Sequence, residues 1–220
     1  MILDILEKSF YERDTITVAK NLLGKYLVHK VNNRILGGKI VEVEAYTGIN
    51  DKAAHVYGGK KTPRVMPMYG EAGNTYIYSI YGKYVCLNII TVKKGEPQGV
   101  LIRALEPLFS LDEIAYFRFK KDYKDLTRKE ILNLTSGPSK LCMALNITKE
   151  LNNQLIGENN LYLLKNCENT KSMIEKEEEA EGNIVASKRI GIDYAMEAKD
   201  YLYRFYYQDN PYVSVKDKNM

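Results

Sequence analysis

Residues that build metal sites and disulfide frameworks are scarce in this sequence. It contains two histidines, three cysteines and no tryptophan among 220 residues. The cysteines (Cys86, Cys142 and Cys167) are widely spaced, and no C-x-x-C pair occurs. This pattern argues against a disulfide framework, a structural zinc site or a histidine-based metal cluster. We therefore expect a reduced, cytoplasmic protein.

Long apolar runs are also missing. No segment approaches the roughly 20 apolar residues of a membrane-spanning helix. The opening residues, MILDILEKSFYERD, carry acidic side chains early and do not resemble a signal peptide. Apolar residues make up 45% of the chain and charged residues 27%, which is ordinary for a globular protein. We expect one domain, spanning residues 1–220, and no membrane segment.

Tyrosine, in contrast, is abundant. The chain has 18 tyrosines and 5 phenylalanines, and its net charge is +4. Tyrosine suits stacking surfaces because it combines a flat apolar face with a polar tip, although a general bias toward Ile, Lys, Asn and Tyr explains the count equally well. The mildly basic balance permits contact with a polyanion without requiring it.

The order of the expected elements indicates an α+β fold. Strand-like runs follow one early helix, helices come next, and short strands return at the end. Because the pattern does not alternate strand and helix, a mainly antiparallel sheet is favoured. We expect strands at 26–31, 35–46, 75–81, 84–92, 99–105, 160–164 and 201–207, a helix at 17–23, and helices that begin with capping boxes at Ser110 and Thr127.

Three polar segments have two interpretations each. The acidic run 175–181 is a solvated helix face or mobile loop, or else an acidic tail that would avoid DNA. The basic stretch 118–129 is a solvated surface or an edge that contacts phosphates. The segment 136–140, SGPSK, holds a phosphate or merely begins a structural helix.

Candidate chemistry begins on the strand 40–46. Side chains alternate faces along a strand, so Glu42, Glu44 and Tyr46 share one face, with neighbouring carboxylates about 6–7 Å apart. An exposed strand explains this pattern, and so does a general base beside an aromatic ring. Asp51 is expected to cap a short helix that ends near His55, which would bring this histidine to the same pocket unless its role is structural.

Further polar and aromatic residues follow. Tyr78 shares a strand face with Tyr76, and Tyr81 precedes Gly82, where a sharp turn would expose it. These are ordinary sheet tyrosines, or else a stacking surface and a protruding wedge. The next strands carry Asn88 and then Arg103, which lies in an apolar run and so needs a carboxylate partner, either Glu44 or Glu42. The basic loop 57–64, which ends at Arg64, could contact backbone phosphates.

Taken together, these stretches resemble the alkyladenine (3-methyladenine) DNA glycosylases. The resemblance rests on IVEVEAYTGINDKAAHVYGGKKTPR, NTYIYSIYGKYVCLNI, GVLIRALEP, LTSGPSKLCMAL and RFYYQDNPYVSV, from about residue 15 to 215. It implies a DNA repair enzyme with a curved antiparallel sheet and no cofactor, and we expect this enzyme to be a monomer. The implied partner is double-stranded DNA with alkylated or deaminated purines (3-methyladenine, 7-methylguanine, hypoxanthine or ethenoadenine), and in a bacterium the enzyme would be associated with the nucleoid.

The resemblance also implies roles for individual residues. Glu44 would activate the attacking water, and Arg103 would position this water or a phosphate. A damaged base rotated out of the duplex would stack on aromatic walls, and Asn88 would discriminate against guanine. Tyr81 would fill the gap left in the duplex. The stacking residues would be Tyr46, His55 and Tyr78.

One position departs from the family pattern. Lys83 stands two residues after Tyr81, where relatives commonly carry an apolar side chain such as Met. Lys83 would then contact a phosphate, as would Arg64. Two other functions remain open: a nucleic-acid-binding module without catalysis, and a carboxylate-based hydrolase of small nucleosides. In a glycosylase, Glu44→Gln should abolish base release but spare DNA binding, whereas in a binding module it should change neither much. In a nucleoside hydrolase, free nucleosides should compete with duplex DNA.

Overall fold

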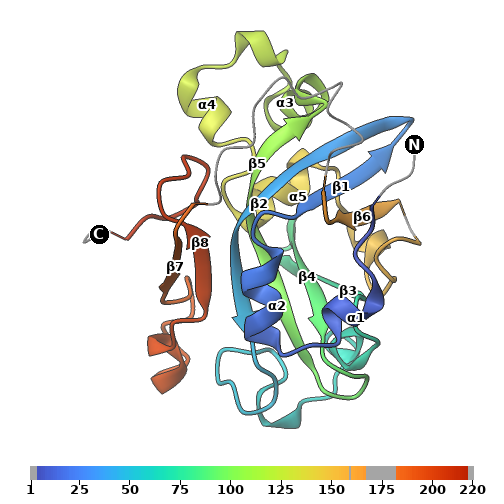
Figure 1. The fold of residues 1–220 in the computed structure, drawn as a ribbon, viewed down its shortest axis with the longest axis vertical. Coiled ribbons are helices and arrows are strands. Elements are labelled where there is room, and N and C mark those ends of the chain that lie inside the picture. Colours follow the sequence, from blue (N-terminus) through green and yellow to red (C-terminus); the bar gives the residue numbers. More distant parts are fainter. Residues whose placement is uncertain (1–3, 159, 167–181, 218–220) are drawn as a thin grey trace.

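The computed structural model describes residues 4–158, 160–166 and 182–217. Within these residues, eight strands form one sheet with the order β3-β4-β5-β2-β1-β6, while β8 pairs with β2 and β7 pairs with β8 (Figure 1). Every pairing is antiparallel, which confirms the expected α+β class. The strands are β1 (Tyr26–Val31), β2 (Arg34–Tyr46), β3 (Thr75–Ile80), β4 (Tyr84–Thr91), β5 (Gln98–Phe109), β6 (Leu161–Leu164), β7 (Ile184–Ser187) and β8 (Arg204–Tyr207).

Short helices surround this sheet. The early helix starts two residues before its predicted position, because the Asp14 side chain caps it by accepting hydrogen bonds from the Ile16 and Thr17 amides. The α-helices are α1 (Lys8–Tyr11), α2 (Thr15–Leu22), α3 (Leu111–Phe119), α4 (Arg128–Leu132) and α5 (Pro138–Ala144). The 3-10 helices are η1 (Tyr57–Gly59), η2 (Met66–Tyr69), η3 (Tyr123–Asp125), η4 (Lys149–Leu151) and η6 (Met196–Asp200).

The two predicted capping boxes have different outcomes. The box at Thr127 is confirmed, since its hydroxyl accepts from the Glu130 amide and the Glu130 carboxylate accepts from the Thr127 amide. The box at Ser110 is wrong, although α3 begins there as predicted. Ser110 follows directly on β5, and the chain turns from strand to helix through a left-handed residue with φ 49°. An N-cap needs an extended backbone instead, so the Ser110 side chain makes no capping bond.

β2 is the central strand and positions the site. It pairs with β5 along one edge, while its other edge pairs first with β1 and then, at residues 42–44, with β8. Register shifts at Gly37/Gly38 and after Ile40 bend the strand. A Cβ at Gly38 would collide with the Glu106 carbonyl of β5, so this close approach of two backbones requires glycine.

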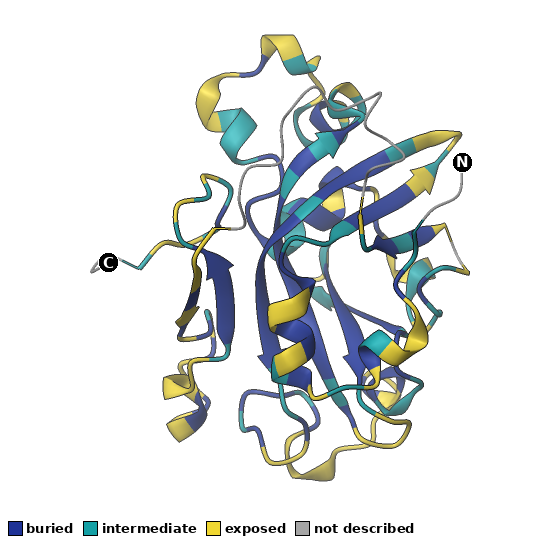
Figure 2. Cartoon of the chain, viewed as in Figure 1, coloured by how far each residue is buried: buried dark blue, intermediate teal, exposed yellow. Residues whose placement is uncertain are grey.

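The core lies against one face of β2. Val41, Val43 and Ala45 are fully buried there and pack in one cluster with residues of α2 and α5. Glu42 and Glu44 point to the other face, as predicted, but both are also fully buried. The interpretation of this face as an exposed strand face is therefore wrong. Arg204 of β8 and the Ser214 amide cover Glu42. The Ile190 amide, between β7 and β8, covers Glu44. Figure 2 shows this burial along the central strands.

No helix in the described ranges is both long and apolar enough to span a bilayer. Nor do these ranges bring together three or more His, Cys, Asp or Glu side chains in a metal-binding arrangement. The acidic run 175–181 and Cys167 lie outside the described residues.

Candidate active site

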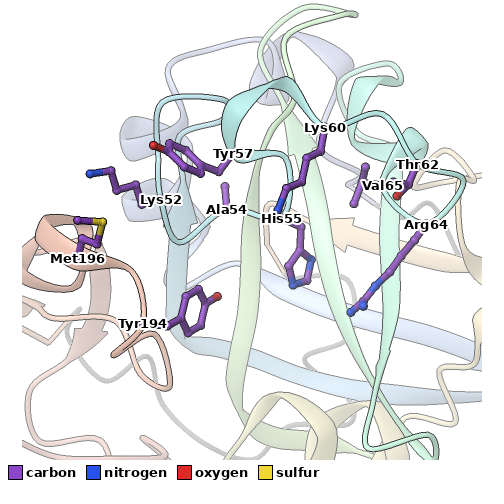
Figure 3. Close-up of a pocket in the computed structure, with 10 residues that line it drawn as sticks. All are labelled: Lys52, Ala54, His55, Tyr57, Lys60, Thr62, Arg64, Val65, Tyr194 and Met196. Carbon is purple, nitrogen blue, oxygen red and sulfur yellow. The ribbon is translucent and has the colours of Figure 1, made fainter.

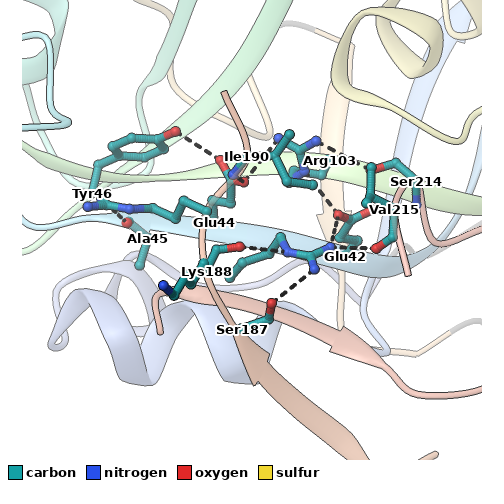
Figure 4. A network of polar contacts seen from close by, with 12 residues as sticks. Glu42, Glu44, Ala45, Tyr46, Arg103, Ser187, Lys188, Ile190, Ser214 and Val215 are labelled. Atoms are coloured by element: carbon teal, nitrogen blue, oxygen red, sulfur yellow. Dashed lines mark hydrogen bonds and ion pairs between the residues drawn. The ribbon is translucent and has the colours of Figure 1, made fainter. Parts of the chain in front are cut away.

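Glu44 stands near the end of β2, opposite Leu101 of β5 and Arg204 of β8. Its side chain is fully shielded from solvent. Three donors reach the carboxylate (Figure 4): the Ile190 amide at 2.7 Å and an Arg103 nitrogen at 3.1 Å contact Oε1, and the Tyr46 hydroxyl at 2.8 Å contacts Oε2. Because a carboxylate oxygen offers about two acceptor positions, Oε2 keeps one position beyond these contacts.

Arg103 joins the two carboxylates of β2. Its Nε donates to Glu42 at 3.0 Å, and a terminal nitrogen lies 3.1 Å from Glu44. Burial alone would lower the pKa of Arg103, but the charges of Glu44 and Glu42 outweigh it and raise this pKa above its ordinary value. The predicted pairing of Arg103 with a carboxylate is confirmed, and it involves both candidates. The arginine is thus a fixed positive charge beside Glu44.

Glu42 has a second role, which is to hold the C-terminal segment. Its carboxylate accepts from Arg204 of β8 at 3.0 Å and from the Ser214 amide at 2.7 Å. Arg204 continues outward to Ser187 and Asp217, each at 3.0 Å. This network ties β8 and residues 214–217 to β2 at Glu42, the neighbour of Glu44 on the same strand face (Figure 4).

Tyr46 connects Glu44 to an aromatic cluster. Burial, with smaller contributions from Glu44 and Tyr78, raises the pKa of Tyr46 well above its usual value, so the hydroxyl stays protonated and donates to Glu44. The ring of Tyr46 packs with Tyr76 and Tyr78 in one apolar cluster. The carboxylate is therefore not separated from the tyrosines that the sequence placed beside it.

His55 completes this cluster. Its ring lies 4.6 Å from the Tyr78 ring at an angle of 83°, and its Nδ1 is 2.9 Å from the Tyr76 hydroxyl. Burial, followed by the nearby charges of Arg64 and Lys60, lowers the pKa of His55 to about 4. The imidazole is therefore neutral at pH 7. The structure brings His55 to Tyr78 as expected.

The route by which the chain reaches His55 differs from the prediction. No helix forms between Asp51 and His55, where the backbone makes successive turns. Asp51 accepts from the Thr47 and Ala53 amides and pairs with the buried Arg189 at 2.5 Å and 2.8 Å. Asp51 therefore makes a cap-type bond to the Ala53 amide, but the chain continues in turns and not in a helix, and the same carboxylate also holds Arg189.

Three further predicted residues lie on β4 and in the turn between β3 and β4. Asn88 is buried on β4, where its amide donates to the Tyr76 carbonyl at 3.1 Å. Tyr81 is 93% exposed at the turn between β3 and β4 and adopts a left-handed φ of 49°, a strained conformation for a bulky residue. Lys83 is exposed in the same turn, 6.0 Å from the Tyr84 ring centroid. The prediction that Tyr81 protrudes from a turn is confirmed.

A cavity of about 480 Å³ opens on the His55 side of the cluster (Figure 3). This volume lies within the range of small-ligand sites, about 300–1,000 Å³. His55 and Arg64 contribute to its wall, whereas Glu44, Tyr46, Tyr78 and Asn88 do not. The Arg64 guanidinium also lies 5.7 Å from the Tyr78 ring centroid, so it connects the cavity to the aromatic cluster. The lining residues are Lys52, Ala54, His55, Tyr57, Lys60, Thr62, Arg64, Val65, Tyr194 and Met196.

Sequence reasoning missed the segment 189–196. Arg189 is fully buried against Asp51 and lies 4.8 Å from the Tyr46 ring centroid, Ile190 donates its amide to Glu44, and Tyr194 and Met196 line the cavity. The motif Arg-Ile-Gly that starts this segment resembles an ordinary loop. The glycine at position 191 is the local signal of a turn, and in the structure it adopts a positive φ of 75°.

Chemically, the arrangement combines three features. A buried, acceptor-only carboxylate can take a proton or stabilise a developing positive charge. A neutral imidazole and three tyrosine rings form an apolar, polarisable wall beside it. Exposed Lys60 and Arg64 add positive charge at the entrance.

Comparisons with known proteins give one consistent family. A family described as methylpurine-DNA glycosylase (MPG) matches residues 9–211. A protein of Clostridium tetani is 52% identical over 96% of this chain and 99% of its own length, and one of Clostridium acetobutylicum is 51% identical over 97% and 99%. A protein of Clostridium novyi is 53% identical over 96% and 98%. Each carries the name "Putative 3-methyladenine DNA glycosylase".

Proposed function

Because this chain belongs to the methylpurine-DNA glycosylase family, we propose that it is a monofunctional glycosylase that excises alkylated or deaminated purines from duplex DNA. The family assignment supports the coarser statement that it is a DNA repair glycosylase. The finer statement rests chiefly on one observation: a fully buried carboxylate, Glu44, hydrogen-bonded to an aromatic cluster.

The first step in this proposal is base flipping. A base within a duplex is out of reach of a buried carboxylate, so the damaged nucleotide must rotate out at a cost of a few kcal/mol. Exposed Tyr81 is suited to occupy the space that the base leaves, because an inserted side chain replaces lost stacking. Arg64 and Lys83 are exposed cations near the cavity and the turn, which suits contact with phosphates.

The flipped base would then stack on Tyr46, His55 and Tyr78. Stacking on aromatic side chains returns about 1–3 kcal/mol per base. Purines methylated at N3 or N7 carry positive charge, which strengthens attraction to the π faces and makes the base a better leaving group. Neutral His55 offers a hydrogen bond to the base without charge repulsion, and Asn88 would test the edge of the base.

Glu44 would act on the sugar side. Its Oε2 receives a hydrogen bond from Tyr46 and keeps one acceptor position for the attacking water. The same carboxylate would stabilise the positive charge that develops on the sugar as the glycosidic bond breaks. Because Glu44 is shielded from solvent, entry of the substrate would open a path to this free position, while the Tyr46 hydroxyl keeps its hydrogen bond to the carboxylate. Arg103 would hold the carboxylate in place from the far side.

The decisive experiment uses duplexes with a single 3-methyladenine-like, hypoxanthine or ethenoadenine residue. We expect release of the free base and an intact strand that carries an abasic site, with or without EDTA. Strand cleavage by the protein would contradict the monofunctional assignment. The absence of base release from every lesion would overturn the proposed function in favour of a binding module.

A further inference from the structure

A buried arginine lies behind the candidate active site. The side chain of Arg189, in the segment between β7 and η6, is completely shielded from solvent. Its two terminal nitrogens donate to the carboxylate of Asp51, at 2.5 Å and 2.8 Å, and to the carbonyls of Ala45 and Ala198, at 2.9 Å and 3.2 Å. One side chain thereby joins the end of β2, the loop that follows it and η6.

The guanidinium of Arg189 also contacts two tyrosine rings. Its central carbon lies 4.8 Å from the Tyr46 ring centroid and 5.4 Å from the Tyr203 ring centroid. A cation at this distance is attracted by the π electrons of a ring. Burial alone would lower the pKa of Arg189, but the hydrogen bond and the charge of Asp51 outweigh it and raise this pKa, so the side chain stays charged. The arginine therefore holds the Tyr46 ring from the interior of the protein.

Stability alone does not explain an arginine at this place. Among the described residues, the buried Nε of Arg189 finds no acceptor. A buried donor without a partner costs free energy, and apolar side chains of similar volume often replace a buried ion pair without loss of stability. Such a group calls for a further role.

Two contacts connect Arg189 to the candidate base. The Tyr46 hydroxyl donates to Oε2 of Glu44 at 2.8 Å, and Arg189 contacts the ring that carries this hydroxyl. The next residue in the chain, Ile190, donates its amide to Oε1 at 2.7 Å. Arg103 supplies the third donor, at 3.1 Å, also to Oε1. Arg189 therefore fixes one donor on each oxygen of the carboxylate.

We propose that Arg189 is a positioning residue, which orients the Glu44 carboxylate through these two donors. This inference rests on the proposed function, because it takes Glu44 as the group that activates the water. A carboxylate that turns no longer directs its free acceptor position at the attacking water, and small misplacements of reacting groups slow a reaction by as much as about 100-fold. Binding of the lesion duplex does not need this alignment. Arg189 should therefore affect the rate of base release and not the affinity.

Arg189→Lys tests the proposal. Lysine keeps a positive charge for Asp51 but lacks the planar fork that joins the three segments. We expect single-turnover release of a damaged purine to slow by about 10-fold, with unchanged affinity for the lesion duplex. The matched control is Arg204→Lys, because Arg204 is also fully buried, ion-paired and 4.6 Å from a tyrosine ring, but binds Glu42 instead. It should show a similar loss in thermal melting and keep most of the rate.

A double-mutant cycle with Tyr46→Phe separates positioning from a general loss of structure. If Arg189 acts through the Tyr46 hydroxyl, Tyr46→Phe has already removed part of its effect. The double variant should then lose about 30-fold in rate, whereas two independent losses of about 10-fold would multiply to about 100-fold. Losses that multiply would overturn the proposal, as would a rate loss in Arg204→Lys equal to that in Arg189→Lys.

A second variant covers the case in which Arg189→Lys does not fold. Tyr203→Leu removes one ring beside the guanidinium and leaves the Asp51 pair intact, so it loosens Arg189 without leaving a buried charge unpaired. We expect a rate loss of about 3-fold and faster hydrogen exchange of the Ile190 amide, measured by NMR. Unchanged exchange at Ile190 would overturn the proposal. If the wild type released no base, the proposed function would fail, while the exchange rate would still decide whether Arg189 positions this donor.

Discussion

The Tyr46 hydroxyl donates a 2.8 Å hydrogen bond to Oε2 of Glu44, two residues earlier on the same strand. Alternation of side chains along β2 puts both on one face, and burial keeps the tyrosine protonated by raising its pKa. The candidate base and the first wall of the stacking cluster are therefore one unit. Any movement of the Tyr46 ring also changes the contacts of the carboxylate.

Tyr46→Phe tests this coupling. The substitution keeps the stacking ring but removes one donor from Glu44, so the carboxylate loses part of its orientation. We expect the single-turnover rate of base release to fall about 10-fold, which corresponds to about 1.4 kcal/mol, while lesion-duplex affinity changes little. Rapid-quench kinetics at saturating protein measures the rate. A rate equal to that of the wild type would show that the hydroxyl does not matter.

Asp51→Asn should destabilise the fold strongly. Asp51 and Arg189 are both fully buried, and loss of one partner leaves an uncompensated charge, at a cost of about 3–5 kcal/mol. The matched control is Asp200→Asn, which breaks the exposed Lys188–Asp200 pair and should shift the urea midpoint far less than Asp51→Asn does. Urea denaturation measures both. Similar losses in the two variants would argue against this account.

His55 should make stability depend on pH. The folded state keeps its pKa at about 4, below the usual value of 6.5, so the unfolded chain binds a proton first as the pH falls. Neutral His55 therefore favours the folded state above pH 6.5. As the pH falls from about 6.5 to 4, the free energy of unfolding decreases by up to about 3 kcal/mol. Urea midpoints across this range should fall less steeply in His55→Gln. The pKa of His29 is lowered as well, so part of the slope should remain.

Tyr81→Ala should separate duplex from single-stranded substrates. The side chain is 93% exposed, so its loss should change the free energy of unfolding by no more than about 0.5 kcal/mol. A wedge matters only where a stack must be opened. We expect base release to weaken more for a lesion in a duplex than for the same lesion in a single strand. Equal losses on both substrates would remove the wedge role.

Local patterns predicted much of the fold. The alternation of Val and Glu along residues 40–46 identified the two faces of β2, and Gly82 identified the turn that exposes Tyr81. The capping box at Thr127 was also predictable from the sequence, because all of its hydrogen bonds lie within four residues. Such features depend on residues that are close together in the sequence, so they can be inferred from one sequence alone.

Long-range contacts escaped prediction for the opposite reason. The pairing of Asp51 with Arg189 joins residues 138 positions apart, and the Ile190 amide reaches Glu44 across 146 positions. No local pattern marks either contact. Burial of Glu42 and Glu44 likewise depends on β8. This strand pairs with β2, although it lies about 160 residues later in the sequence.

The central claim is that Glu44 performs the chemistry. Its test is single-turnover release of a damaged purine by Glu44→Gln, with Glu42→Gln as the matched control, since both carboxylates are buried and bound to Arg103. We expect Glu44→Gln to melt as a folded protein, to bind the lesion duplex, and to lose at least about 100-fold in rate. Glu42→Gln should lose stability but retain most of the rate. Base release by Glu44→Gln at the wild-type rate would contradict the account.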